Sequence, residues 1–205
     1  MPINKSLLST QFDRGLVNAI AQIIVSALLR LISLVAFYKL PFPIIGSTWI
    51  SDFFLPASLM IFFAFLGSLW PVIGITIGSF MYIALYRGLP WDIVITTSLP
   101  SSFALLFTML YLFTSSHELL YQPLAARLTL ARIMLVSVVY GFWNSLFYFF
   151  AFLCHADYFQ AFVSFDYWSL LHLFIGDVFG GVAVLGTLKS LAYILGARPI
   201  RRRIN

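Results

Sequence analysis

The sequence predicts an all-α, polytopic bundle of about six membrane-spanning helices, formed as a single domain. Of the 205 residues, 61% are hydrophobic and only 9% carry a charge, whereas a soluble domain carries about 25% charged residues. The apolar residues lie in continuous runs, and a transmembrane β-barrel would instead alternate apolar and polar residues. No segment of ordinary soluble composition is long enough to form a second domain, so residues 1–205 are expected to be one integral membrane domain.

Polar residues, prolines and glycines divide the apolar sequence into runs close to the roughly 20 residues that a helix needs to cross a bilayer. The last run is longer than this, so it either tilts or begins outside the hydrocarbon. The six spans are expected at about residues 15–38, 49–66, 70–86, 93–113, 128–153 and 167–195.

The second and third spans are joined by so few residues that an antiparallel helical hairpin is expected. Pro71 suits the first turn of the later helix, where its missing N–H needs no partner. Trp70 suits the headgroup region of the bilayer. Pro56 either opens or kinks the earlier helix, and Asp52 lies just before it.

The fourth span contains Pro100 between serines, close to its start. A proline at this depth interrupts the helical hydrogen bonds, so the span is predicted to be broken there and its first part to be a loop or a kinked turn.

Basic residues near the span ends predict that both termini face the cytoplasm. With six spans, the cytoplasmic side receives most of the arginines, including the C-terminal group 198–203, and the opposite side receives only Lys39 and Arg87. The C-terminal arginines are read as a membrane flank, so no nucleic-acid partner is expected.

Asp177 is the first candidate for an intramembrane function. A carboxylate deep in a span costs about 2.5–3.5 kcal/mol on insertion scales, so it is expected to face the bundle interior and to have a partner. Arg30 is the obvious cation, which makes an Arg30–Asp177 ion pair possible. In the alternative, Arg30 reaches toward the membrane surface and Asp177 is structural. Gly176 and Gly180 have the small-xxx-small spacing that lets helices approach closely.

No metal centre, cofactor or catalytic set is expected from the sequence. Only one histidine, His172, falls within a predicted span, whereas haem in a bundle needs facing histidines at similar depth. The chain also contains no G-x-S-x-G or Ser-x-x-Lys element for nucleophilic catalysis. A membrane enzyme is therefore the weakest of the candidate functions.

The first of two notable stretches reads F-L-P-A-S-L-M at residues 54–60, followed by G-S-L-W-P-V-I-G-I-T-I-G-S-F at residues 67–80, and the second reads G-D-V-F-G at residues 176–180. Together they resemble the MASE1 integral membrane sensor domain of bacteria. The similarity extends over residues 49–195, although its specific part is about 25 residues. Gly176 to Gly180 looks like the acidic and small-residue element near the end of that domain, and Thr187 or a neighbour stands where the family commonly has proline. The first stretch matches the family at Pro56, Ala57, Ser58, Gly67, Trp70, Pro71, Gly74 and Gly78.

The resemblance implies a multi-pass protein of the bacterial inner membrane that receives a signal or recruits a partner without being an enzyme. MASE1 domains usually precede an output module, so a separate membrane or cytoplasmic protein would be the partner here, with membrane lipids around both. A small-molecule transporter or substrate-capture subunit, and an accessory subunit of a larger membrane complex, remain the alternatives. The candidate ligand or partner site consists of Asp52, Pro56, Trp70, Pro71, Trp143, Asn144, His172, Asp177 and Gly180.

Overall fold

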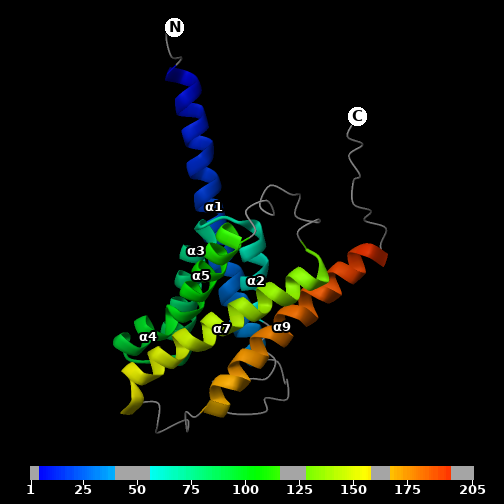
Figure 1. Ribbon diagram of the computed structural model, residues 1–205. Coiled ribbons are helices and arrows are strands. Elements are labelled where there is room, and N and C mark those ends of the chain that lie inside the picture. Colours follow the sequence, from blue (N-terminus) through cyan, green and yellow to red (C-terminus); the bar gives the residue numbers. More distant parts are fainter. Residues whose placement is uncertain (1–4, 40–55, 116–127, 158–166, 195–205) are drawn as a thin grey trace.

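A computed structural model describes residues 5–39, 56–115, 128–157 and 167–194, and all of its regular elements in these ranges are helices (Figure 1). The predicted all-α class is therefore confirmed. The elements are α1 (Lys5–Lys39), α2 (Pro56–Leu66), α3 (Trp70–Tyr82), the π-helical η1 (Ile83–Arg87), α4 (Trp91–Ser98), α5 (Pro100–Ser115), α7 (Leu130–Cys154) and α9 (Tyr167–Ile194).

Among the described residues, four helical segments are long and apolar enough to cross a membrane: Gly15–Phe37, Trp91–Ser115, Leu130–Cys154 and Trp168–Leu191. They coincide with the first, fourth, fifth and sixth predicted spans. As described, α2 has only 11 residues, and the third predicted span consists of α3 continued by η1. The count of six spans and the cytoplasmic location of both termini stay predictions.

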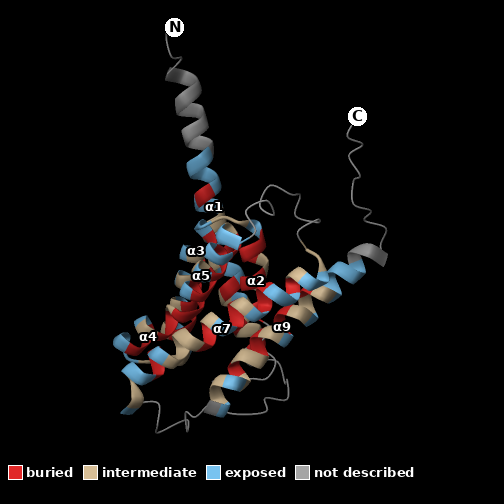
Figure 2. Cartoon of the chain, viewed as in Figure 1, coloured by how far each residue is buried: buried red, intermediate tan, exposed pale blue. Residues whose placement is uncertain are grey.

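The helices pack mainly as two pairs, α1 with α3 and α7 with α9, and α5 and α2 contact both pairs. In Figure 1, α7 and α9 run alongside each other over much of their length. Buried residues, red in Figure 2, lie on the sides of α2, α5 and α7 that face one another. Fifteen buried hydrophobic residues form the main core, and α2 supplies Ala57, Met60, Ile61, Phe63, Ala64 and Phe65.

The short turn predicted between the second and third spans is present between α2 and α3, but these two helices do not pack mainly against each other. Gly67 has a φ of 69°, which favours glycine, and Pro71 lies in the first turn of α3 as predicted. The described part of α2 contacts mainly α9 and α5, however, whereas α3 contacts mainly α1 and α5. The two helices diverge because each finds its main partner elsewhere in the bundle.

Close approach of α1 and α3 depends on two glycines of α3, Gly74 and Gly78. A Cβ atom at Gly78 would lie 2.5 Å from the carbonyl oxygen of Ala27, and one at Gly74 would overlap the backbone at Ile23. Their spacing is that of the G-x-x-x-G motif, which brings helix backbones together. The same spacing predicts this role for Gly176 and Gly180 of α9, and both are buried.

The fourth predicted span is interrupted at Leu99, as expected, but its first part is the regular helix α4 and not a loop. Helix α4 ends at Ser98 and α5 begins at Pro100. The N–H groups of Ser102 and Phe103 both donate to the carbonyl oxygen of Leu99, each at 3.0 Å, which starts a new helical turn. A helix can be interrupted at membrane depth when the break is buried in protein, and Pro100 is buried.

Candidate functional site

Seven buried polar residues from five helices form the candidate site, which we call the polar cluster. Each of the seven is at most 3% exposed. The members are Arg30 of α1, Ser79 of α3, Ser101 of α5, Ser137, Tyr140 and Asn144 of α7, and Asp177 of α9.

Arg30 connects three helices at one side of the polar cluster. Its Nε donates to Ser79 Oγ at 3.0 Å, and its Nη2 donates to Ser101 Oγ at 3.1 Å. This position follows from the close α1–α3 contact, because the Cβ of Arg30 lies beside Gly78. The guanidinium is 1% exposed, so it does not reach toward the surface as one of the sequence-based alternatives required.

Asp177 and Asn144 form the other side of the polar cluster. The Nδ2 of Asn144 donates to Asp177 Oδ2 at 2.7 Å. These contacts differ from the direct Arg30–Asp177 ion pair considered from the sequence, because an amide on α7 holds the carboxyl group and hydroxyls on α3 and α5 hold the guanidinium. The Tyr140 side chain is within electrostatic range of both ionisable groups, Arg30 and Asp177.

Several polar atoms of the cluster have no hydrogen-bond partner. Tyr140 approaches Ser101, but the hydroxyl makes no hydrogen bond of normal geometry. Leaving a buried polar atom unpaired costs about 1–3 kcal/mol, so such atoms are normally rare. In the described part of the chain, the unpaired atoms of the cluster are Ser137 Oγ, Tyr140 OH, Asn144 Oδ1 and Asp177 Oδ1.

The break between α4 and α5 lies directly beside the polar cluster. Ser101, which binds Arg30, is the second residue of α5. Ser102, the next residue, accepts a hydrogen bond of 2.7 Å from Thr76 of α3. Interrupted helices whose ends line a polar site are a recurrent feature of transporters.

Of the residues predicted for the site, the structure brings Asn144 and Asp177 into contact, whereas Trp143 belongs to a separate aromatic group. The ring of Trp143 lies 4.8 Å from that of Phe107 and 5.9 Å from that of Phe147, measured between centroids. Trp70 is 46% exposed at the start of α3.

The remaining predicted residues are not among the hydrogen-bonded members of the cluster. Pro56, Pro71 and Gly180 are buried, and His172 is partly buried. Asp52 lies outside the described residues.

Sequence reasoning missed Ser79, Ser101, Ser137 and Tyr140. For two of them, the sequence contains a pattern that would have indicated their place in the site. Ser137 and Tyr140 precede Asn144 by seven and four residues, which places all three on one face of a helix. Ser79 and Ser101 could be recognised only once Arg30 had been placed.

A second polar contact joins α4 to the end of α7. His155 Nε2 lies 2.8 Å from Thr96 Oγ1, and His155 Nδ1 lies 3.9 Å from Asp92 Oδ2. The Asp92 side chain is 70% exposed, so this contact belongs to the periphery of the bundle.

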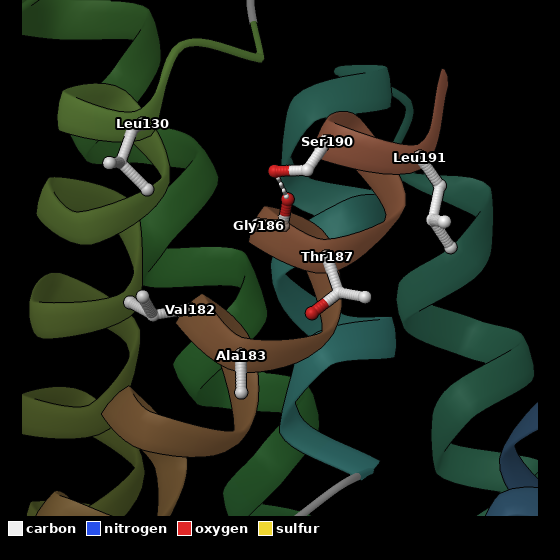
Figure 3. Close-up of a pocket in the computed structure, with 7 residues that line it drawn as sticks. All are labelled: Leu130, Val182, Ala183, Gly186, Thr187, Ser190 and Leu191. Carbon is white, nitrogen blue, oxygen red and sulfur yellow. Dashed lines mark hydrogen bonds between the residues drawn. The ribbon is translucent and has the colours of Figure 1, made fainter. Parts of the chain in front are cut away.

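A groove of about 480 Å³ lies between the start of α7 and the end of α9 (Figure 3). Ser190 contributes a hydroxyl, but this already donates to the carbonyl oxygen of Gly186 at 2.9 Å. None of the lining residues belongs to the polar cluster. The lining residues are Leu130, Val182, Ala183, Gly186, Thr187, Ser190 and Leu191.

Comparisons of the chain with protein-family models, with curated proteins and with solved structures found no match. The resemblance to MASE1 domains therefore stays a prediction.

Proposed function

We propose that the chain is an integral membrane protein that takes a small polar solute into the polar cluster between its helices, for capture or transport. The observation that carries this proposal is that, in the described part of α7, the hydroxyl groups of Ser137 and Tyr140 are buried and have no hydrogen-bond partner. A polar solute with donors and acceptors of its own would satisfy them.

If the polar cluster had only a structural role, its unpaired atoms would cost the fold more free energy than its hydrogen bonds contribute. Polar contacts between membrane helices contribute about 0.6 kcal/mol each on average. The contacts of Arg30 with Ser79 and Ser101, and that of Asn144 with Asp177, therefore contribute about 2 kcal/mol in total. The unpaired hydroxyls of Ser137 and Tyr140 alone would cost about 2–6 kcal/mol. Polar groups that destabilise a bundle in this way favour a binding role.

The helix break supports transport or capture over sensing alone. Interruptions at a midplane site supply helix ends that contact a solute, and they let the halves of a span move separately. The sensory or partner-binding role predicted from the sequence needs the same binding step, but the solute would then act as a signal and would not cross. In either case we expect a bacterial inner-membrane protein without enzymatic activity.

The test is purification in a mild detergent followed by native mass spectrometry for bound small molecules. Two variants remove unpaired oxygens at nearly constant volume, Tyr140→Phe and Ser137→Ala. The matched control is Ser190→Ala, whose hydroxyl bonds only to its own helix. We expect a bound species in the unmodified protein and the control, and its loss in both cluster variants.

Equal retention in all four proteins, or no bound species in any of them, would contradict the proposal. If the species is identified, its flux into proteoliposomes separates transport from sensing, since only a transporter moves it across the membrane.

A further inference from the structure

We propose that Asp177 and Asn144 form a proton-binding site, in which a protonated carboxyl group and the amide make a cyclic, neutral pair. The Asp177 carboxyl would donate its proton to the Asn144 carbonyl oxygen, while the Asn144 amide donates to the other carboxyl oxygen. The proton is the ligand of this site, and it is exchangeable.

The hydrogen-bond pattern around the two side chains leads to this proposal. One bond is present, from Asn144 Nδ2 to Asp177 Oδ2 at 2.7 Å. The other oxygen of each group, Asp177 Oδ1 and Asn144 Oδ1, is buried without a partner. An ionised carboxylate only accepts hydrogen bonds, so it cannot satisfy the amide oxygen. A single proton on Asp177 Oδ1 supplies the missing donor and thereby satisfies both atoms.

The burial of Asp177 also favours a neutral, protonated carboxyl group over a carboxylate. Both Asp177 and Asn144 are 0% exposed. A carboxylate in such a place is costly unless a cation or several donors compensate its charge, and Asn144 is its one hydrogen-bond donor among the described residues. A neutral carboxylic acid avoids this cost.

Few other titratable groups face Asp177 from the elements packed on α9. From α7 the nearby group is Tyr140, and the described part of α2 contains no titratable side chain. His172 precedes Asp177 by five residues on α9 itself. Arg30 of α1 is the cation of the cluster, and its hydrogen bonds with Ser79 and Ser101 do not require an ionised Asp177.

Release of the proton would place a carboxylate within electrostatic range of Arg30. The guanidinium would then be drawn away from Ser101, which lies at the helix break. Use of this proton to drive solute movement rests on the proposed function, whereas the proton site itself does not.

The test is infrared difference spectroscopy of the purified full chain, titrated with pH and exchanged into D2O. We expect a carbonyl band of a protonated carboxylic acid near neutral pH that shifts on deuteration. It should be absent in Asp177→Asn and kept in Asp92→Asn, the exposed control. Labelling aspartate carboxyls with ¹³C should shift the band in the unmodified protein, which assigns it without any variant.

The variant Asp177→Asn is expected to fold, because a second amide can form the same cyclic pair with Asn144. Thermal unfolding within a few degrees of the unmodified protein would support this. Absence of the band near neutral pH, or its persistence in Asp177→Asn, overturns the proposal. The readout needs no solute, so failure of the proton site and failure of solute binding are seen separately.

Discussion

Gly78→Ala is the substitution whose effect can be worked out most fully from the structure. The new Cβ atom would lie 2.5 Å from the carbonyl oxygen of Ala27 and 2.9 Å from the Cβ of Arg30. Ordinary contact begins at 3.4 Å, so the backbone of α1 must retreat by roughly 0.9 Å. The neighbouring atom is a backbone carbonyl oxygen, which cannot rotate away as a side chain could.

A retreat of this size should affect both stability and the site. Inserting a methyl group into a well-packed interface costs about 1–3 kcal/mol, and the better helix propensity of alanine returns at most about 1 kcal/mol. The Arg30–Ser79 bond of 3.0 Å would lengthen beyond hydrogen-bonding distance. We therefore expect a net loss of about 1–2 kcal/mol, together with weaker solute retention.

The assay is thermal unfolding in detergent, compared with Gly186→Ala. A Cβ at Gly186 would lie 3.9 Å from Leu130 Cδ1, which is an ordinary contact. The control should therefore match or exceed the stability of the unmodified protein. If Gly78→Ala and Gly186→Ala unfold at the same temperature, the result would contradict the close packing of α1 on α3 at Gly78.

Three further substitutions test other features of the structure: a hydrogen bond of Arg30, the break between α4 and α5, and the polar contact between α4 and the end of α7. Ser101→Ala leaves a guanidinium N–H buried without this acceptor, which costs more than the hydrogen bond itself contributes, so unfolding measurements should show a loss of about 1.5–3 kcal/mol; no change would mean that Arg30 does not use this hydroxyl. Pro100→Ala restores the missing N–H, so we expect a more stable protein with weaker solute retention in native mass spectrometry; unchanged retention would remove the break from the site. His155→Ala should cost about 0.5–1.5 kcal/mol by releasing Thr96, whereas an increase in melting temperature would contradict that contact.

The positions of the long helices and of the break were predictable because each depends on local sequence. Continuous apolar runs located the spans, and Pro100 located the interruption, since a missing N–H acts on its own helix. Pro71 at the start of α3 follows from the same argument.

Helix pairing was not predictable in this way, because it depends on contacts between distant residues. Arg30 and its partner Ser79 are 49 residues apart in the chain. Gly74 and Gly78 show the G-x-x-x-G spacing in the sequence, but the identity of the helix that packs against them follows only from the fold. The intramembrane charges were recognised, but their partners turned out to be hydroxyls and an amide, which are too common in sequence to single out.

The most direct test of a binding role for the polar cluster is the thermal unfolding temperature of solute-free Tyr140→Phe. The Tyr140 hydroxyl is fully buried and, among the described residues, has no hydrogen-bond partner. If it serves a solute, its removal should stabilise the empty protein by about 1–3 kcal/mol while solute retention falls. A lower unfolding temperature would show that the hydroxyl holds the bundle together, and it would contradict the account.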